Sequence, residues 1–394
     1  MVTSFYPPYH VGGACVHVYH LANALAEKGH EVHVLYSKSA YYLKRKGQPS
    51  SKDYPNHDNI RLFEIESPVG RLAPVHSYVT GFPVSLKVRA VFKQNYDIIH
   101  YHNISLMGPI VLRLGDALKI YTAHDHWLFC PYNDYFTGGQ VCGIKPAPLP
   151  CSIDLLKNKR PPQLWRFTNI LKNALRSIDL ILSPSQYLES FLLKNGLERP
   201  ISVLPNFVLD PPDDMPVLAE EDFFFYAGML EEIKGISSLL EVFQKIDRKL
   251  VIAGNGSLQD YVKRVAAKRS TISYVGWLER KKLYSYYTKA NAFILASRCP
   301  ENSPLTVLEA YSVGTPALGS DIGGIPEIIA GVDRNLLFQP GDINEMAEKI
   351  SSFSRYSYDK ARIRKYFNAR FSSDHYVDRY LLLVEGVLEN SGRI

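Results

Sequence analysis

Short apolar runs alternate with helical patterns along almost the whole chain. Residues 2–6 and 31–36 have the composition of buried strands, and residues 14–28 between them repeat apolar side chains at helical spacing. This alternation predicts a doubly wound parallel sheet with helices on both faces. It restarts at residues 223–226, after the proline- and acid-rich residues 210–216. We therefore expect two α/β domains joined by a linker.

The 394 residues are enough for two domains with a full core each, and an apolar fraction of 46% excludes a disordered or fibrous chain. No apolar run approaches the roughly 20 residues that a membrane span needs. The five cysteines are an odd number in a long chain with no visible signal peptide, which favours a reducing compartment. These features predict a cytoplasmic protein.

The net charge of +6 is distributed unevenly. Residues 1–184 carry 20 Lys and Arg against 12 Asp and Glu, whereas the remaining residues carry 25 against 27. A basic first half suits an anionic partner such as a phospholipid surface or a lipid-diphosphate acceptor, and predicts a peripheral protein at the inner face of the membrane. Residues 164–176 predict a basic amphipathic helix, which either packs on its own sheet or lies on such a membrane. The alternative is a solvated surface with no special partner; nucleic acid is not expected, because no known binding motif is present.

The segment with the most chemistry follows an apolar run at residues 292–297, which predicts a buried parallel strand. After a short loop, Ser303 is expected to cap a helix, and Pro304 to occupy its first turn, where a missing N–H costs nothing. The free N–H groups of Leu305 and Thr306 would then point toward an anion such as a phosphate.

Two glutamates bracket that helix start. Glu301 precedes it, and Glu309 lies inside it. Carboxylates on both sides of a bound phosphate can accept hydrogen bonds from hydroxyls, and a sugar nucleotide is a diphosphate with a polyol at either end. The arrangement predicts a nucleotide-sugar site, although the spacing alone fits two ordinary acidic residues of a helix equally well.

Residues 297–329 resemble the signature of the family-four retaining glycosyltransferases. The resemblance rests on Glu301-Asn302-Ser303-Pro304-Leu305, Gly314-Thr315-Pro316 and Gly323-Gly324-Ile325-Pro326-Glu327, and it extends over nearly the whole chain. It implies the GT-B fold, in which two Rossmann-like doubly wound domains face each other across a cleft. The implied parts are an acceptor-binding domain at residues 1–208, a nucleotide-sugar-binding domain at residues 209–372, and a helix at residues 373–394 that crosses back to the first domain.

Four glycine-containing turns fit the same family. Gly12-Gly13 resembles its donor loop, and residues 228–235 resemble its diphosphate clamp, except that Met229 stands where arginine is usual and removes a forked phosphate donor. The turns at residues 254–256 and 276–278 also match, although Trp277 suits a core equally well. The resemblance implies the following donor-binding residues: Gly12, Gly13, Gly228, Lys234, Gly254, Asn255, Trp277, Leu278, Glu301, Ser303, Pro304, Leu305, Thr306 and Glu309.

Two histidines, His102 and His124, end neighbouring predicted strands, at the edge where open α/β sheets bind ligands. A single histidine is more often a core or loop residue. Members of the family, however, carry a histidine at the position of His124, beside the acceptor and the reacting sugar. The resemblance implies His124, Glu301 and Lys234 as catalytic residues, and His102, Asn103 and Asp125 as acceptor-side residues.

No metal is expected at the reacting centre, because the chain contains no Asp-x-Asp motif to bridge a diphosphate and must use its own cations. Cys130, Cys142 and Cys151 lack the paired C-x2-C spacing of a zinc site. Thiols in an acceptor-side flap are therefore favoured over a structural metal that His124 or His126 would complete.

Together with the resemblance, these residues predict a metal-independent retaining hexosyl- or pentosyltransferase that needs no cofactor. It would move a sugar from a nucleoside-diphosphate sugar to a saccharide or lipid-linked acceptor in polysaccharide biosynthesis. Lys234 would neutralise the leaving diphosphate, Glu301 would bind sugar hydroxyls, and Glu309 the ribose. Two alternatives remain: a non-catalytic nucleotide-sugar-binding or assembly protein, which Met229 favours, and a sugar-nucleotide 2-epimerase. The sequence leaves the sugar, the base and the acceptor open.

Overall fold

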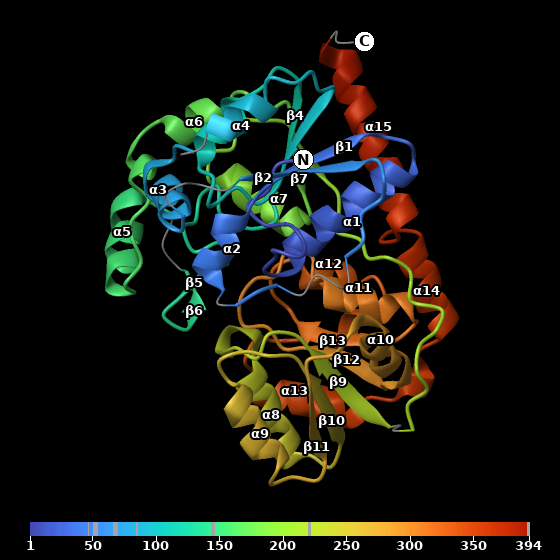
Figure 1. The fold of residues 1–394 in the computed structure, drawn as a ribbon. Helices are drawn as coiled ribbons and strands as arrows, with labels where there is room; N and C mark the ends of the chain where they lie inside the picture. The colour runs from blue at the N-terminus through green and yellow to red at the C-terminus, as the bar shows by residue number, and fades with distance from the viewer. Residues whose placement is uncertain are drawn as a thin grey trace. The chain divides into compact units, whose positions relative to one another are not determined.

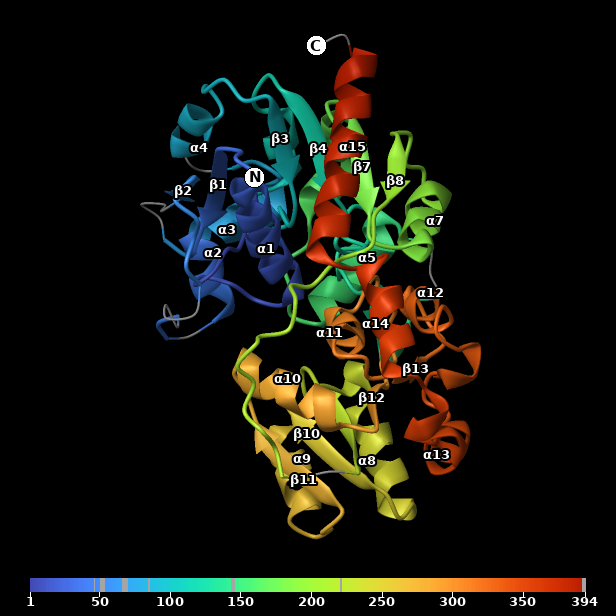
Figure 2. The ribbon, with the colours of Figure 1, turned by 90° about the vertical axis from the view of Figure 1, so that its right-hand side faces the viewer.

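The structure is a computed structural model, and it consists of two compact units (Figures 1 and 2). Each unit contains one parallel sheet with helices packed on it, so the predicted α/β class is confirmed. The first unit comprises Met1–Asn133, Gly143–Leu204 and Val377–Ile394, and the second comprises Asp134–Cys142 and Pro205–Tyr376. The described residues are 1–45, 47–49, 54–65, 70–83, 86–142, 146–219 and 222–391.

In the first unit all strand pairings of the main sheet are parallel. The first predicted strand is reduced to Val2, which bridges Leu35 on one side and Tyr101 on the other and so joins the two halves of the sheet. The chain therefore winds outward in both directions from Val2, as in a Rossmann fold. The strands are β2 (Ile60–Ile65), β1 (Val32–Ser37), β3 (Ile98–Tyr101), β4 (Leu118–Thr122), β7 (Leu180–Ser183) and β8 (Ile201–Val203), in spatial order with Val2 between β1 and β3.

Helix α1 (Gly13–Glu27) begins after Gly12, whose φ of 81° suits a glycine, and it ends before Gly29, as the sequence predicts. The polar, irregular sequence of Tyr41–Asn59 predicts a mobile loop, but this stretch starts inside a helix, α2 (Lys38–Lys44), which Ser37 caps through its hydroxyl. Residues 46 and 50–53 lie outside the described residues. The other helices of this unit are α3 (Leu72–Thr80), α4 (Leu86–Val91), η1 (Pro109–Arg113), α5 (Pro148–Lys157), η2 (Leu164–Phe167), α6 (Ile170–Leu175) and α7 (Gln186–Lys194).

The prediction of a single helix over residues 164–176 is wrong. It is divided into η2 and α6 at Thr168 and Asn169. The Thr168 hydroxyl donates to the Trp165 carbonyl at 2.7 Å and accepts from the Ile170 N–H at 3.2 Å. A side chain that bonds the backbone on both sides offers an alternative to helical hydrogen bonds, and here it ends one helix and starts the next.

The second unit has a six-stranded parallel sheet whose central strand β9 is buried at every position. Its spatial order is β11-β10-β9-β12-β13-β14, so the direction of winding reverses between β9 and β12. The strands are β9 (Phe223–Ala227), β10 (Lys249–Ala253), β11 (Ile272–Gly276), β12 (Ala292–Leu295), β13 (Ala317–Ser320) and β14 (Leu337–Phe338). The helices are η3 (Glu232–Lys234), α8 (Ile236–Lys245), α9 (Gln259–Ala266), α10 (Arg280–Lys289), α11 (Leu305–Ser312), α12 (Ile325–Ile329), η4 (Arg334–Leu336), α13 (Ile343–Ser352), η5 (Arg355–Ser357) and α14 (Lys360–Asn368).

Two segments belong to a unit that is distant in sequence. The hairpin β5 (Phe136–Thr137) and β6 (Gln140–Val141) lies with the second unit, where the Gly139 carbonyl accepts from Arg298 at 3.4 Å, although its residues fall within the range 1–208 expected for the first domain. The last helix, α15 (Ser373–Ser391), lies with the first unit from Val377 onward (Figure 2). Its Tyr380 hydroxyl hydrogen bonds with the His100 ring at 3.1 Å. No helix in the described part of the chain has the length and apolarity of a bilayer span.

Candidate active site

The second unit holds a shielded ion pair at the point where its sheet reverses direction. Lys234 follows β9, Glu301 follows β12, and the Lys234 Nζ lies 2.6 Å from the Glu301 Oε1. The Ser297 hydroxyl donates to the same carboxylate oxygen at 2.6 Å. Both charged side chains are less than one-fifth exposed, at 18% and 19%. Open parallel sheets bind ligands outside the carboxyl ends of their strands at such a reversal, so this pair marks the candidate site.

The backbone explains why a glycine follows the lysine. Gly235 has a φ of 72°, and a Cβ there would lie 1.8 Å from the Ala296 carbonyl oxygen. The Arg298 N–H donates to the Ile233 carbonyl at 2.8 Å, which ties the same two loops together. No side chain larger than the hydrogen of glycine fits between the two loops at this position. Their close approach brings the lysine of one loop to the glutamate of the other.

Both members of the pair are charged at neutral pH. Burial lowers the pKa of Lys234, but the Glu301 charge and its hydrogen bond outweigh this effect and leave the pKa raised. Burial raises the pKa of Glu301, but the Lys234 charge and the hydrogen bonds from Lys234 and Ser297 leave it lowered. The result is a desolvated cation beside a carboxylate acceptor, which suits an anion with neighbouring hydroxyls.

The other predicted donor loops meet at the same edge of the sheet. A Cβ on Gly254 would lie 1.9 Å from the Gly228 carbonyl oxygen, and the Asn255 carbonyl accepts from the Leu230 N–H at 2.9 Å. These loops therefore run side by side after β9 and β10. The side chain of Met229 is half exposed, and its carbonyl accepts from the Tyr226 hydroxyl at 2.8 Å and from the Glu231 N–H at 3.0 Å.

After β11, Trp277 is 63% exposed, which rules out the alternative that it is a core residue, whereas Leu278 is buried. The arginine nearest the ion pair in sequence, Arg298, extends its guanidinium to Glu232, at 3.0 Å. The structure thus places the Arg298 guanidinium in a partly exposed ion pair of its own.

The helix start differs from the prediction in one detail. Helix α11 begins at Leu305 after Pro304, but Ser303 is not its cap: the Ser303 hydroxyl accepts from the Asn206 backbone N–H at 3.2 Å. Pro304 has no side chain that can accept a hydrogen bond, so the first turn with Leu305 and Thr306 carries no side-chain cap. Uncapped N–H groups at a helix start favour an anion.

Glu309 lies one turn further along α11 and is shielded together with Tyr287 of α10. The Tyr287 hydroxyl donates to the Glu309 Oε2 at 2.9 Å. Burial raises the pKa of Glu309 to about 7, although the Tyr287 hydrogen bond and the charge of Arg280 oppose this effect. Glu309 is therefore a carboxyl group that exchanges its proton near neutral pH.

This raised pKa predicts a pH-dependent stability. In the folded protein the pKa of Glu309 is about 7, so the carboxyl keeps its proton up to near neutral pH. In the unfolded chain its pKa is 4.5, so the proton is released at lower pH. The stabilisation is complete below pH 4.5 and is lost as the pH rises through 7. Relative to Glu309→Gln, the wild type should lose about 2 to 3 kcal/mol of unfolding free energy between pH 5 and 8. Urea denaturation of both proteins across this range measures the difference, and parallel curves would contradict the assignment.

The first unit holds a cluster of imidazoles at the carboxyl ends of β3 and β4. The His102 Nδ1 lies 3.1 Å from the His124 Nε2, so the two predicted histidines form a hydrogen bond. His17 of α1 reaches the same place, with its ring centre 5.2 Å from that of His124. The ring centre of His100 lies 3.9 Å from that of His102, with the ring planes tilted by 37°, and the His100 ring hydrogen bonds with the Thr122 hydroxyl at 2.8 Å. His17 and His100 were not among the predicted site residues; the His-x-His pattern on a strand was the available signal for His100.

These imidazoles are neutral at neutral pH. Burial lowers the pKa of His124 to about 4. Burial lowers the pKa of His102, and neighbouring imidazoles lower it further. The His102 Nε2 is buried with no hydrogen-bond partner among the described residues, so its lone pair rather than a proton belongs there. His102 then donates from Nδ1, which leaves the proton of His124 on its own Nδ1.

The remaining predicted residues of this unit are engaged in loop structure. The Asn103 Oδ1 accepts from the backbone and hydroxyl of Ser105. The two carboxylate oxygens of Asp125 accept from the Trp127 N–H at 2.8 Å and the Asn133 amide at 2.9 Å. Gly12 and Gly13 are exposed at the start of α1. An acceptor-side role for Asn103 and Asp125 stays a prediction.

The five cysteines all lie in the described residues and form no disulfide. Burial raises the pKa of Cys15 and Cys299, so these two are thiols. Within the described ranges no group of three or more His, Cys, Asp or Glu side chains is placed to hold a metal ion.

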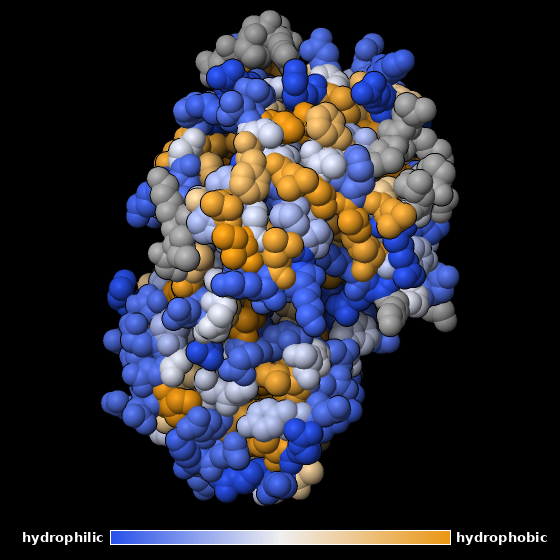
Figure 3. All heavy atoms as spheres, turned by 90° about the vertical axis from the view of Figure 1, so that its left-hand side faces the viewer, coloured by the Kyte–Doolittle hydropathy of each residue, from blue (hydrophilic) through white to orange (hydrophobic). Residues whose placement is uncertain are grey.

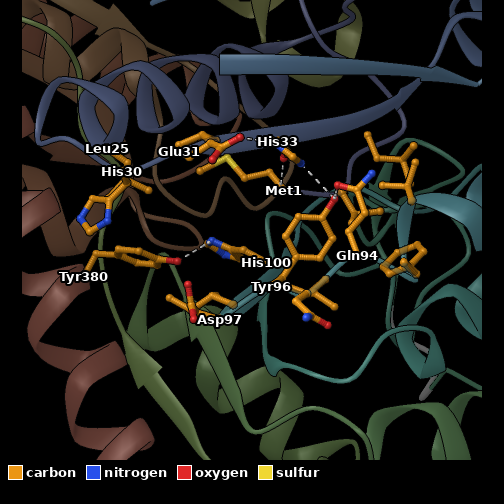
Figure 4. A pocket seen from close by; sticks show the side chains of 18 of the residues that line it. Met1, Leu25, His30, Glu31, His33, Gln94, Tyr96, Asp97, His100 and Tyr380 are labelled. Atoms are coloured by element: carbon orange, nitrogen blue, oxygen red, sulfur yellow. Dashed lines mark hydrogen bonds and ion pairs between the residues drawn. The ribbon is translucent and has the colours of Figure 1, made fainter. Parts of the chain in front are cut away.

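A cavity of about 300 Å³ lies in the first unit, at the amino ends of its strands (Figure 4). Its lining includes Glu31, His33, Tyr96 and Asp97, and the His33 ring links Glu31 at 2.9 Å to the Tyr96 hydroxyl at 3.1 Å. Parallel sheets bind substrates at the opposite edge, so this cavity is separate from the candidate site.

A parallel sheet in each of two units, with polar groups at its carboxyl edge, matches the GT-B fold of glycosyltransferases. Residues 11–209 match the family described as Glycosyltransferase Family 4, and residues 214–370 match Glycosyl transferases group 1. The chain belongs to this family of retaining glycosyltransferases, which use nucleotide-sugar donors.

The relatives and solved structures named next align with 89% to 99% of this chain. The O-antigen chain mannosyltransferase C of Escherichia coli is 25% identical over 98% of this chain and 97% of its own length. Glycogen synthase of Mycobacterium tuberculosis is 24% identical over 89% of this chain and 84% of its own length. Sucrose-phosphate synthase of Thermosynechococcus elongatus has a TM-score of 0.73 at 17% identity and covers 99% of this chain, with 98% of its own chain aligned. Anabaena HepE in complex with UDP has a TM-score of 0.65 at 15% identity and covers 98% of this chain, with 99% of its own chain aligned.

Proposed function

We propose that this enzyme transfers a sugar from a nucleoside-diphosphate sugar to a hydroxyl of a saccharide or lipid-linked acceptor, without a metal ion. The observation that carries the proposal is the Lys234–Glu301 pair at the reversal point of the second sheet. A buried lysine beside a helix start suits a diphosphate, and a carboxylate bonded to that lysine suits the hydroxyls of the attached sugar.

The second unit would stabilise the leaving group. As the bond between the anomeric carbon and the diphosphate oxygen breaks, negative charge grows on the diphosphate. Lys234 and the uncapped N–H groups of Leu305 and Thr306 are already in place to meet this charge, so little reorganisation is needed during the reaction. Glu301 would hold sugar hydroxyls, and Glu309 would accept from the ribose.

The first unit would bind the acceptor. The acceptor oxygen bonds to the anomeric carbon on the face that the diphosphate leaves, and its proton passes to the departing diphosphate oxygen, so configuration is retained. His124, with its proton on Nδ1, would donate to the reacting sugar. His102 would act as a positioning residue that fixes this tautomer.

The named relatives support a saccharide acceptor. The E. coli relative is named for an O-antigen chain, and the M. tuberculosis relative is named for glycogen, so both names refer to growing sugar chains. The HepE structure holds UDP, which supports a uridine nucleotide as the first donor to test. We therefore propose a role in polysaccharide biosynthesis.

A donor screen followed by a transfer assay tests the proposal. UDP-, GDP- and ADP-sugars are compared by thermal shift, and one class should raise the melting temperature well above the others. With that donor and an oligosaccharide panel, NMR should show a product with the donor's anomeric configuration, and excess EDTA should leave the rate unchanged. An inverted product, loss of activity in EDTA, or conversion of the donor without an acceptor would each contradict the proposal.

A further inference from the structure

Helix α5 turns much of its apolar surface toward solvent. Of its apolar side chains only Leu155 is buried, whereas Leu149, Ile153 and Leu156 are 62%, 47% and 60% exposed. These three residues are spaced four and three apart and therefore share one face of the helix. A soluble helix normally buries such a face, so its exposure requires an explanation.

The neighbouring turn η2 also exposes apolar side chains to solvent, and hydrogen bonds hold it in place. Trp165 is buried, its indole N–H donates to the Tyr78 carbonyl at 2.9 Å, and the Arg166 guanidinium donates to the Leu128 carbonyl at 3.1 Å. With these two anchors pointing inward, Leu164 and Phe167 are each 52% exposed. Residues three apart eclipse one another in a 3₁₀ turn, so they form one projecting apolar pair.

The two apolar groups are neighbours, because α5 packs against η2. Figure 1 places α5 and α3 at its left edge, and Figure 3, which faces that side, shows apolar side chains gathered on this face of the first unit. We call Leu149, Ile153, Leu156, Leu164 and Phe167 the α5 face.

Positive charge surrounds the α5 face. Residues 146–176 contain six Lys and Arg against one Asp. Lys157, the last residue of α5, is exposed, as are Lys159 and Arg160 directly after it. Apolar side chains that project between exposed cations are the combination that binds at the headgroup level of anionic membranes.

We propose that the α5 face docks this enzyme on a membrane surface rich in anionic phospholipid. The five apolar side chains would enter the boundary between headgroups and acyl chains, while the lysines and arginine would contact the headgroup phosphates. The charge favours this partner over a second copy of the chain, whose equal positive charge would oppose self-association. The inference adds to the proposed function that the acceptor is lipid-linked, but its test needs neither donor nor acceptor.

Vesicle binding of the full chain tests the proposal by co-sedimentation. Wild type should bind vesicles of phosphatidylcholine and phosphatidylglycerol much better than pure phosphatidylcholine, and binding should weaken with added salt. Leu149→Ser/Leu156→Ser and Lys157→Gln/Lys159→Gln should each lower the partition coefficient on the order of 10-fold or more. All four positions are exposed, so the melting temperature should not change.

Matched variants away from the face serve as controls. Leu193→Ser/Leu382→Ser alters two exposed leucines of α7 and α15, and Lys263→Gln/Lys268→Gln removes two exposed lysines, one in α9 and one just after it. Both should bind like wild type, as should Glu301→Gln, which tests the proposed chemistry alone. Equal binding by face and control variants, or no preference for anionic vesicles, would overturn the proposal. So would a wild-type dimer in sedimentation velocity that the face variants dissociate, since that result assigns the face to a second copy.

Discussion

Lys234→Ala is expected to lower the transfer rate by on the order of 10²- to 10³-fold, the effect of removing one preorganised group that stabilises transition-state charge. The same change leaves Glu301 shielded without its cation. Removing one partner of a shielded ion pair costs about 3 kcal/mol of unfolding free energy. Steady-state kinetics and urea denaturation measure the two effects separately.

The exposed pair Lys245–Glu241 in the same unit provides the control. Its atoms lie 2.7 Å apart, but both side chains are more than half exposed, so Lys245→Ala should cost less than about 0.5 kcal/mol and leave transfer unchanged. A double variant, Lys234→Ala/Glu301→Gln, should recover part of the stability because no unpaired carboxylate remains, but it should recover no activity. Transfer near the wild-type rate in Lys234→Ala would refute the role of this lysine.

His124→Ala is expected to reduce kcat by on the order of 100-fold, a typical loss for removing one positioned hydrogen-bond donor at the reacting centre. The affinity for the nucleoside diphosphate should not change, because the proposed donor site lies in the second unit. His102→Ala should produce a smaller loss, about 10-fold, since it removes only the hydrogen bond that fixes the His124 tautomer. His102→Asn, which keeps a donor, should restore part of it.

His30 offers a matched control, because it is an exposed histidine of the same unit. His30→Ala should leave both kcat and nucleotide affinity unchanged. Calorimetry with the diphosphate separates binding from turnover in all four variants. A wild-type kcat in His124→Ala would exclude His124 from the reacting centre, and a loss of nucleotide affinity would place it on the donor instead.

Local patterns were sufficient for most of the fold. Strand β9, Phe223–Ala227, starts at the predicted residue 223 and extends one residue past the predicted end, because an apolar run between turn residues has few other conformations in an α/β chain. Errors arose where a side chain bonded the nearby backbone: Thr168 divided a predicted helix, and Ser303 bonded Asn206 instead of capping α11. Helical periodicity contains no information about such hydroxyls.

The sequence by itself determined the parallel α/β class of both sheets, the strand ends that carry the polar site residues, and the glycosyltransferase family. Tertiary structure alone decided which of those ends are neighbours: Lys234 and Glu301 meet across 67 residues because β9 and β12 are adjacent in the sheet. It also decided the state of the charges, since the burial that raises the pKa of Glu309 and keeps His124 neutral depends on what packs around each group. The apolar spacing of α5 was visible in the chain, but only the packed structure shows that this face points to solvent. Periodicity shows which side chains share a face, and only the packing of other elements decides whether that face is covered.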